Sequence, residues 1–410
     1  MRVAIAGAGL GGLCLAQGLV RAGVDVQVYE RDAGLAARRQ GYRLHMDARA
    51  GLSLQKCLPP RLFRLFLATT GRPGTKVTVL SAQLRVLHET PGGPDRDPDD
   101  PATLSTSADR GTLREILAAG LADRIRYGRE LAGHDQDAGG VTLRFADGSA
   151  ERADVLVGAD GVGSVVRRAL LPEARLVDTG ARVIYGKTLL DGAARRLVPA
   201  AMHNGFTAVT GGHLGLATGL VEFRRSPSDA AAALAPGVRL SPAADYLMWG
   251  LSAQHDRLPA ADSELAGADA ATLHATACRA IRTWHPDLRA LLAGAAVDET
   301  FFIRVRSSRR VPAWPPSRVT LLGDAIHAMS PARGSGANTA LMDAANLCAA
   351  LTGGTDLVPA IGGYEQSMRE YGFAAVDASR QAEAETARRG SSPWLWLVNH
   401  WPRPRRTAGR

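Results

Sequence analysis

Short apolar runs that end at glycine and lead into a helical period recur three times along the chain. Each run is the first part of a longer segment, and the three segments are 2–32, 153–167 and 317–351. A continuous apolar run of this length is typical of a strand buried on both faces, and a strand followed by a turn and a helix predicts an α/β arrangement. In the third segment the pattern predicts a helix that opens near Asn338 and continues to Leu351.

A different pattern fills the region between the second and third of these segments. Its apolar stretches are short, rich in β-branched or aromatic residues and separated by turns, which is typical of strands in a sheet. The stretches are 181–190, 206–212, 214–223 and 245–253, together with the similar residues 75–89. They predict a large second sheet that lies over the site formed by the first three segments.

Composition and charge narrow the class of protein. Of the 410 residues, 46% are hydrophobic and 22% are charged, which fits an ordered globular chain. The formal charge is +9, carried mostly by arginine, but the arginines are dispersed and no basic tract has interleaved aromatic residues. We therefore expect no nucleic-acid partner, and an arginine excess also suits a protein that holds anionic cofactors.

Two further features concern location and metal binding. No apolar run approaches the roughly 20 residues that span a bilayer, and the chain opens directly on a strand, so we expect a cytoplasmic protein without stable membrane insertion. The four cysteines form no CxxC pair and have no metal-ligand spacing, so we expect reduced thiols and no metal site.

The first segment contains the residues of a dinucleotide-binding turn. Gly7, Gly9 and Gly12 complete GxGxxG between the strand and the helix, and Glu30 ends the next strand. The first glycine permits a tight turn, the second lets the backbone approach a pyrophosphate, and the third lets the helix pack closely on the strand. Free N–H groups at the helix start favour the anion, and the acid can accept from ribose hydroxyls. The segment predicts a dinucleotide site without choosing between NAD and FAD.

All three segments together resemble one family. The glycine motif, "GADGVGSVVR" at 158–167 and "GDAIHAMSPARGSGAN" at 323–338 occur in the order and separation typical of its three fingerprints. The chain resembles the single-component FAD-dependent aromatic hydroxylases, the group A flavoprotein monooxygenases, which share a fold with para-hydroxybenzoate hydroxylase and the tetracycline-inactivating monooxygenases. The similarity extends from residue 1 to about residue 380.

The resemblance implies an α/β fold with a Rossmann-like FAD-binding domain of the GR2 type, a discontinuous, mainly-β substrate domain and a C-terminal helix. The implied bounds are 1–74, 101–178 and 301–355 for the FAD-binding domain, 75–100 and 179–300 for the substrate domain, and 356–410 for a helix that bridges the domains and a basic tail. A monomer or a homodimer is expected.

The resemblance also assigns cofactor residues. The ADP half of FAD is implied to lie at Gly7, Gly9, Leu10, Gly11, Gly12, Glu30 and Arg31. Arg110, Asp160, Gly323, Asp324, Pro331, Gly334, Gly336, Ala337 and Asn338 are implied to hold the rest of FAD, with Asp324 accepting from the ribityl chain and the N–H groups of Ala337 and Asn338 near the flavin O2. His327 is expected to be structural, because the implied chemistry demands no base there.

Other positions are open to two interpretations. Arg39 and Arg43 lie in a segment that resembles the one holding the mobile flavin and contacting the nicotinamide cofactor, or they are surface arginines without a cofactor role. No catalytic residue is assigned, and Pro331 and Arg43 are candidates for the flavin edge. The tentative substrate pocket, of which only some members are expected to contact substrate, is Tyr185, His203, Phe206, His213, Met248 and Trp249.

The implied function is that of a monooxygenase. NADPH or NADH would reduce FAD, O2 would form a flavin C4a-hydroperoxide, and oxygen would be transferred to an aromatic or polycyclic small molecule, by hydroxylation or epoxidation, in secondary metabolism or antibiotic modification. The alternatives are a flavin-dependent halogenase or an FAD-dependent reductase of the same superfamily. The stretch "WLWLVNHW" at 394–401 has two tryptophans spaced as in halogenases, but it lacks the isoleucine–proline pair of their motif.

Overall fold

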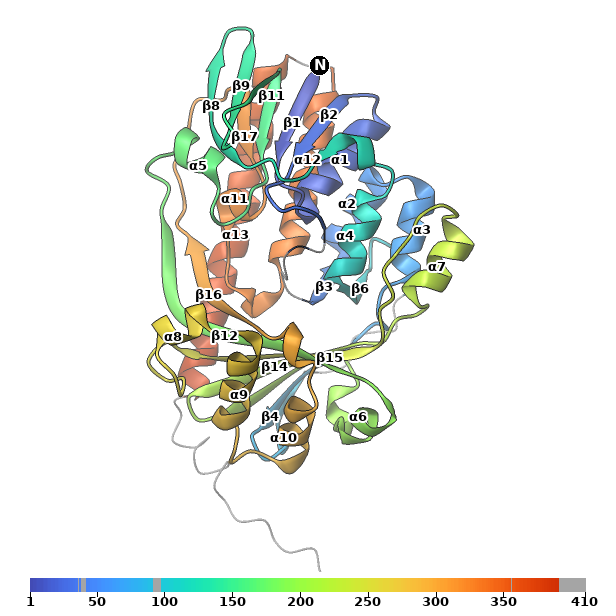
Figure 1. Cartoon of the computed structure of the whole chain (residues 1–410), viewed down its shortest axis with the longest axis vertical. Helices are drawn as coiled ribbons and strands as arrows, with labels where there is room; N and C mark the ends of the chain where they lie inside the picture. The colour runs from blue at the N-terminus through green and yellow to red at the C-terminus, as the bar shows by residue number, and fades with distance from the viewer. Residues whose placement is uncertain (36, 38–41, 91–96, 355, 391–410) are drawn as a thin grey trace, which may run out of the picture.

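The computed structural model describes residues 1–35, 37, 42–90, 97–354 and 356–390. Two sheets of different character face each other, with a small two-stranded sheet between them (Figure 1). One is parallel and covered by helices, and the other is larger and mainly antiparallel. Within this part of the chain, no helix is both long enough and apolar enough to cross a bilayer.

The smaller of the two main sheets is parallel and has five strands. Its order is β17 (Val319–Leu321), β11 (Val155–Gly158), β1 (Arg2–Ala6), β2 (Asp25–Tyr29) and β7 (Ile125–Arg126). The three apolar runs of the sequence are thus adjacent strands, β1, β11 and β17. Because parallel strands have their carboxyl ends at one edge, the three following turns meet there.

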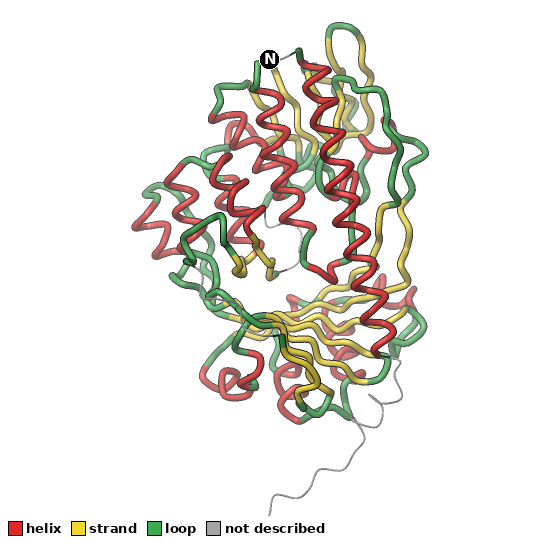
Figure 2. Tube along the Cα trace, turned by 180° about the vertical axis from the view of Figure 1, so that it is seen from behind, coloured by secondary structure: helices red, strands yellow, loops and turns green. Residues whose placement is uncertain are grey.

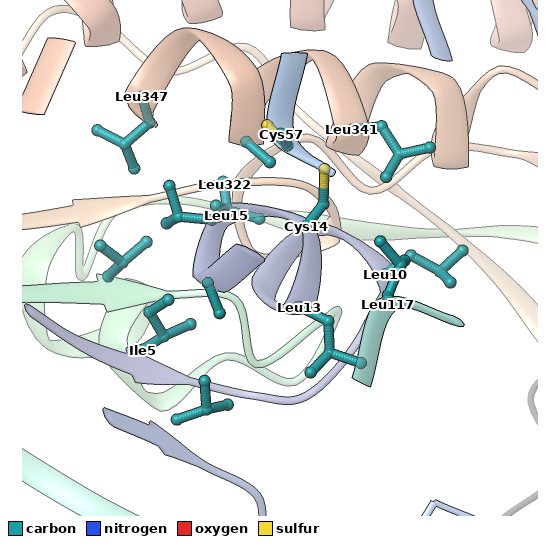
Figure 3. Packing of buried hydrophobic residues seen from close by; sticks show 14 of the residues in the cluster. Ile5, Leu10, Leu13, Cys14, Leu15, Cys57, Leu117, Leu322, Leu341 and Leu347 are labelled. Atoms are coloured by element: carbon teal, nitrogen blue, oxygen red, sulfur yellow. The ribbon is translucent and has the colours of Figure 1, made fainter. Parts of the chain in front are cut away.

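A small antiparallel sheet packs on part of this parallel sheet, and several helices share its core. The helices are α1 (Leu10–Arg21), α2 (Ala48–Cys57), α3 (Pro60–Ala68), α4 (Arg110–Ala118), α5 (Val165–Leu170), α11 (Asp324–His327) and α12 (Gly336–Thr352). Helix α12 opens two residues earlier than the sequence pattern predicts. Side chains of β1, α1, α2 and α12, among them Ile5, Leu15 and Leu341, meet in one continuous core (Figure 3). A separate three-stranded antiparallel sheet follows as β8 (Leu131–Asp137), β9 (Gly140–Phe145) and β10 (Ala150–Ala153).

The larger sheet has seven strands and contains the stretches predicted from alternation. Its order is β16 (Phe301–Ser308), β12 (Leu176–Leu189), β15 (Tyr246–Gln254), β14 (Leu214–Val221), β13 (Phe206–Gly211), β4 (Val77–Ser81) and β5 (Val86–Glu89). Strand β16 pairs with β12, so a domain cut at residue 301 would divide this sheet. The predicted bound at that position is wrong, because strand pairing holds residues 301–308 in the substrate-side sheet.

Helices cover the far face of the seven-stranded sheet, away from the parallel sheet (Figure 1). These helices are α6 (Gly192–Leu197), α8 (Asp262–Gly267), α9 (Ala270–Ala280), α10 (Pro286–Ala293) and the single-turn segments η2 (Ala200–Met202) and η3 (Val297–Glu299). On the side of the parallel sheet, α7 (Pro227–Leu234) packs against α3, the single turn η1 (Ala122–Arg124) contacts β2, and the single turn η4 (Pro331–Arg333) contacts α13. Buried side chains alternate along each strand, so every second residue joins this helix-covered core and the others face the parallel sheet.

Two elements join the halves of the molecule. The two-stranded sheet of β3 (Arg43–Asp47) and β6 (Ser105–Asp109) lies between the main sheets. The long helix α13 (Leu357–Gly390) runs past both of them (Figure 2). It packs against α12 and reaches β16, so residues near its two ends contact different sheets.

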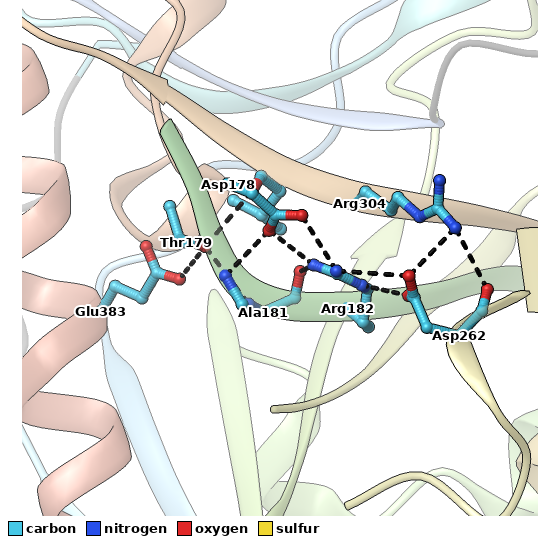
Figure 4. A network of polar contacts seen from close by, with 9 residues as sticks. Asp178, Thr179, Ala181, Arg182, Asp262, Arg304 and Glu383 are labelled. Carbon is cyan, nitrogen blue, oxygen red and sulfur yellow. Dashed lines mark hydrogen bonds and ion pairs between the residues drawn. The ribbon is translucent and has the colours of Figure 1, made fainter. Parts of the chain in front are cut away.

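A polar network secures the lower end of α13 to the bulge in β12. Thr179 donates to Glu383 of α13 at 2.8 Å, next to the bulge between Asp178 and Arg182 (Figure 4). The buried Arg182 guanidinium binds the carboxylates of Asp178, at 2.7 Å, and Asp262 of α8. Strand β12, α8 and α13 are therefore held together by charge-assisted hydrogen bonds.

Candidate functional site

Two glycines of the first turn are packed against backbone atoms, and the third faces open space. Gly7 has a φ of 108°, and a methyl group there would lie 2.4 Å from the carbonyl oxygen of Ala159. A methyl group on Gly12 would lie 2.2 Å from the carbonyl oxygen of Gly7. Gly9 has no atom within 4 Å of the same position. The turn is thus packed on two sides and open at the position where a ligand would approach.

The helices α1 and α12, which follow the glycine turn and the loop of the third fingerprint, start without a capping side chain. Side chains accept from the first turns of α2, α4, α5, α6, α7, α9 and α10. Among the described residues, none does so for α1, which follows Gly9, or for α12, which follows Ser335, and the shorter helices α3, α8 and α11 also start without one. The first N–H groups of a helix have no partner within the helix, and the helix dipole makes that end positive. Both starts therefore suit a negatively charged ligand group.

Glu30 lies where the sequence predicts, at the end of β2 beside the first turn. Its Oε2 accepts from the N–H of Ala8 at 2.8 Å, and its Oε1 accepts from the N–H of Asp32 at 3.0 Å. A carboxylate has about four acceptor positions, so Glu30 keeps capacity for a further donor. Glu30 is buried, which limits that donor to a group inside the site.

Arg114 is a residue that the sequence reasoning missed. It is buried in α4, donates to the carbonyl of Ala8 at 2.8 Å and lies 3.6 Å from Glu30 Oε2. It also donates to the carbonyl of Leu35. Its position one helical turn after Arg110 places both arginines on the same side of α4, and that spacing could have identified it. Arg114 balances the charge of Glu30 and fixes the first turn.

Other predicted residues near the first turn differ in burial. Leu10 is buried, and Gly11 lies where α1 crosses the end of β17 and α12, since a methyl group there would be 2.6 Å from Leu322. Arg31 is exposed, and its Nε lies 3.9 Å from Asp32. Arg39 falls outside the described residues.

The second fingerprint lies directly against the first. A methyl group at Gly7 would be 3.1 Å from the Cα of Asp160, because β11 runs beside β1. Asp160 Oδ2 accepts from the N–H of Val165 at 2.7 Å, at the start of α5. Its Oδ1 is buried without a hydrogen-bond partner among the described residues. One oxygen therefore fixes α5 and the other remains able to accept from a bound group.

Asp324, in the third fingerprint, opens α11 and faces an internal space. Part of its surface is accessible, but protein atoms surround the carboxyl group on most sides. Their desolvation of the group raises its pKa, and the positive charges of His327 and Arg110 oppose this rise. Its Oδ1 lies 3.9 Å from the position of a methyl group on Gly336, the first residue of α12. The carboxylate of Asp324 therefore lies next to the start of α12.

His327 is not part of that space. It has no exposed surface, and its Nε2 lies 2.6 Å from Asp343 Oδ2 in α12. The same carboxylate accepts from the N–H of Gly323 at 2.7 Å and from the Tyr371 hydroxyl of α13 at 2.8 Å. Burial opposes protonation of His327, but the charge of Asp343 raises its pKa above the ordinary value. This buried pair fixes the third fingerprint to both helices, in agreement with the structural role expected for His327.

The loop before α12 is fastened by Asn338. Its side-chain amide donates to the carbonyls of His45 and Gly334, at 2.7 and 3.0 Å, and accepts from the N–H of Asp47 at 2.9 Å. The side chain is thus fully used for structure, so only the backbone N–H of this residue is left for a ligand. Pro331 lies in η4 and is exposed.

Two arginines approach the internal space from other elements. Arg110 is the first residue of α4, its N–H donates to the Tyr42 carbonyl at 2.7 Å, and its charge acts on Asp324. Arg43 in β3 donates to the carbonyl of Leu220 in β14 at 3.3 Å, so it joins the small sheet to the large one. It also lines a small pocket together with Arg72 and the predicted residue His203.

The tentative substrate residues divide between the two faces of the seven-stranded sheet. Tyr185 and Met248 face the parallel sheet, in a cluster with Tyr42. Trp249 has no exposed surface and packs in the helix-covered core against Gly186, so its assignment to the pocket is wrong. The reason is strand alternation, which sends neighbouring residues to opposite faces.

The last two tentative residues lie on β13 or its turn. Phe206 is half-buried at the start of β13, opposite Gly219. His213 is exposed in the turn between β13 and β14.

Two family models match segments that carry this site. A model described as an NAD(P)-binding Rossmann-like domain matches residues 5–66, and one described as an FAD binding domain matches residues 274–356. The first segment contains α1 and Glu30, and the second contains Asp324 and α12. The starts of α1 and α12 thus lie in the two matched segments.

Similar proteins come from fungi and bacteria. The chain is 36% identical over 389 residues to a dual O-methyltransferase/FAD-dependent monooxygenase of Cercospora beticola, which covers 90% of this chain and 44% of that protein. It is 32% identical over 356 residues to the 2-heptyl-3-hydroxy-4(1H)-quinolone synthase of Pseudomonas aeruginosa, with coverages of 84% and 79%. The chain spans less than half the length of the dual-function relatives it matches.

A solved structure extends the similarity to the fold. A protein of Photorhabdus luminescens described as an FAD-containing monooxygenase superposes with a TM-score of 0.79 and 31% identity, over 95% of this chain and 98% of that chain. The similarity therefore includes both sheets and the site between them.

Proposed function

This chain belongs to the FAD-dependent monooxygenases, and from that premise we propose that it uses NAD(P)H and O2 to hydroxylate or epoxidise an aromatic or polycyclic small molecule. A role in secondary metabolism or antibiotic modification is part of the proposal. The observation that carries it is the meeting of three fingerprint turns at one edge of the parallel sheet, with an uncapped helix start on either side.

The residues present fit a dinucleotide with a flavin ring. The N–H groups at the start of α1 would bind the pyrophosphate, which the open space at Gly9 lets approach. Glu30 and Asp324 would accept from hydroxyl groups of the two sugar-derived parts. Bound FAD would supply the transfer of electrons from NAD(P)H to O2, which the protein's own side chains cannot perform.

The start of α12 would act on charge. Its free N–H groups and positive end would stabilise negative charge on the pyrimidine edge of a reduced flavin. Arg110 would add a positive charge close by, since it already acts on Asp324. Neither group needs to exchange a proton, so the protein's part is binding, orientation and electrostatics.

The test uses the purified full chain. We expect a yellow protein with flavin absorption, NAD(P)H oxidation that increases when a substrate is present, and a product heavier by one oxygen atom. A colourless protein that binds no added FAD would overturn the proposal. A halogenated product would favour the halogenase instead, and turnover that continues without O2 would favour the reductase. The segment 394–401, which resembles part of a halogenase motif, lies outside the described residues.

A cytoplasmic location, the absence of a nucleic-acid partner, and a monomeric or homodimeric state remain predictions. The proposal includes NADPH and NADH alike as the electron donor.

A further inference from the structure

Four aromatic rings gather on the face of the seven-stranded sheet that looks toward the proposed flavin. Tyr185 of β12 and Phe301 of β16 are stacked with ring centres 5.5 Å apart. Tyr42, which precedes β3, meets Phe301 edge-on at 5.4 Å and Tyr246 of β15 at 6.4 Å. These four residues, called the aromatic cluster below, come from four separate segments. Edge-on and offset contacts are favourable arrangements of such rings, and they form an apolar lining for another flat ring.

One lysine lies against this cluster. The Lys187 ammonium is 5.1 Å from the ring centre of Tyr42 and 5.6 Å from that of Tyr246. Lys187 is two residues after Tyr185 in β12, so strand alternation puts both on the same face. The chain has only two other lysines, Lys56 and Lys76. A cation held over two ring faces is stabilised there without a full hydrogen-bond shell.

The ammonium is incompletely paired. Its acidic neighbour is Glu299 at 3.6 Å, which is longer than a hydrogen bond, and both side chains are partly exposed. The carboxylate of Asp109 accepts from the Tyr246 hydroxyl at 2.9 Å and from the N–H and hydroxyl of Thr112 at 2.8 and 2.9 Å. Among the described residues, the ion pair of Lys187 is with Glu299 and not with Asp109. Lys187 therefore has donors available for a ligand oxygen.

The electrostatics of the rings favour this assignment. Burial, together with Asp109, raises the pKa of Tyr246, and burial raises the pKa of Tyr185 to about 12, so these two rings stay neutral. The second cation on this side is Arg43, whose Nε donates to the carbonyl of Leu220 at 3.3 Å and so ties it to β14. The face thus combines flat apolar rings with an available positive charge.

We propose that Lys187 determines specificity by binding an anionic oxygen, a carboxylate or an ionised phenol, on a planar aromatic substrate whose rings pack on the aromatic cluster. The inference rests on the proposed function, because it concerns the substrate of that same site. It adds the chemical class of the substrate and names Lys187 as the residue that recognises it.

The test is a calorimetric titration of the FAD-loaded full chain with three matched bicyclic probes. These are 2-naphthoate, 2-naphthol and the neutral 2-naphthalenemethanol. The variants are Lys187→Met, which keeps the apolar stem, and Lys187→Arg, which keeps the charge. The control is Lys76→Met, because Lys76 is paired with Glu89 at 3.0 Å at the edge of the same sheet, away from the cluster.

We expect Lys187→Met to weaken 2-naphthoate binding about tenfold to a hundredfold, the effect of losing one charge-assisted hydrogen bond. Binding of 2-naphthalenemethanol should change less than about threefold, since it has no charge to lose. Lys187→Arg should restore most of the loss, and Lys76→Met should behave as the wild type. A loss for 2-naphthoate alone assigns a carboxylate, and a loss that includes 2-naphthol assigns a phenol that ionises on binding.

Three results would overturn the inference. They are equal losses for all three probes, no loss for any, and failure of the wild type to bind either acidic probe at millimolar concentration. Heat of binding does not depend on flavin chemistry, so it is read separately from the proposed function. NAD(P)H oxidation by the same FAD-loaded preparation tests that function, and either the titration or the oxidation can fail without the other.

Discussion

The parallel sheet and the seven-stranded sheet build their parts of the site by different means. At the parallel sheet the proposed binding groups are backbone N–H groups at the starts of α1 and α12, placed by strand ends and by glycines. At the seven-stranded sheet they are side chains, such as Lys187 and Tyr246, brought together from separate strands. A backbone site depends on local turns, whereas a side-chain site depends on register across the sheet. The two regions should therefore respond differently to the same kind of mutation.

The largest effect is expected at the glycine turn. Gly12→Ala would put a methyl group 2.2 Å from the Gly7 carbonyl oxygen, so we expect little folded protein and no bound FAD. Gly9→Ala is the matched control, because nothing lies within 4 Å of its new methyl group. That variant should fold with the wild-type melting temperature but bind FAD at least about tenfold more weakly, since the methyl group occupies the approach to the pyrophosphate.

Soluble yield, thermal melting and the flavin-to-protein absorbance ratio measure both variants. Wild-type flavin content in Gly12→Ala would contradict the close packing of this turn. Unchanged FAD affinity in Gly9→Ala would contradict the assignment of the pyrophosphate to it.

The next effect concerns the buried pair that fastens the third fingerprint. Asp343→Asn leaves His327 without its charged partner, and breaking a fully buried pair costs about 3–5 kcal/mol of unfolding free energy. Because the pKa of His327 is raised in the folded protein, its charge stabilises below the ordinary histidine pKa, and this stabilisation is lost as pH rises through the raised value. The difference between wild type and variant should therefore shrink at high pH.

Urea unfolding at several pH values measures this effect. Asp377→Asn is the control, because its partner Arg310 and Asp377 itself are more than half exposed, and such pairs contribute less than about 1 kcal/mol. Equal losses of unfolding free energy in the two variants would show that the buried pair stabilises the fold no more than the exposed pair does.

A smaller effect is expected from Glu365 of α13, which packs behind the parallel sheet. Burial raises the pKa of its carboxyl group from 4.5 to about 7. The unfolded chain therefore loses this proton first, so the folded state loses stability as pH rises between these values, by roughly 3 kcal/mol in full. Glu365→Gln should remove this part of the pH dependence, whereas Glu370→Gln, at an exposed position of the same helix, should not. Chemical unfolding at pH 5 and pH 8 measures it, and identical profiles for wild type and Glu365→Gln would refute it.

The smallest effect tests the seven-stranded sheet with the mutation used at the glycine turn. Gly186→Ala would place a methyl group 2.2 Å from the Trp249 ring, which costs about 1–3 kcal/mol as overpacking. FAD affinity should remain within about threefold of wild type, because the helix-covered core is remote from the backbone site. Gly215→Ala is the control, since its new neighbour is the Ser252 hydroxyl at 3.1 Å. Loss of FAD from Gly186→Ala, read from flavin absorbance, would show that the two regions are not separable.

Particular residues show how far sequence patterns predict this molecule. Gly12 and Glu30 lie as their motif indicates, because Gly12 packs on the Gly7 carbonyl and Glu30 accepts from Ala8 within one short stretch of chain. The sequence pattern places Asp343 in a helix and indicates no partner for it. In the structure its carboxylate binds both His327 and the Tyr371 hydroxyl of α13. Contacts of that kind depend on packing between distant segments, and a single sequence does not record them.

The sequence by itself determined the two kinds of sheet and the three fingerprint turns, because hydrophobic period and glycine spacing act over short stretches of chain. The choice of FAD followed from the family resemblance that the three turns carry together. Only the tertiary structure decided which residues share a face. It sent Trp249 to the helix-covered core, placed Arg114 beside Glu30, kept 301–308 in the larger sheet and brought Lys187 to the aromatic cluster. The physical reason is that register and strand order, set by pairing across long stretches of chain, choose the neighbours of every side chain in a sheet.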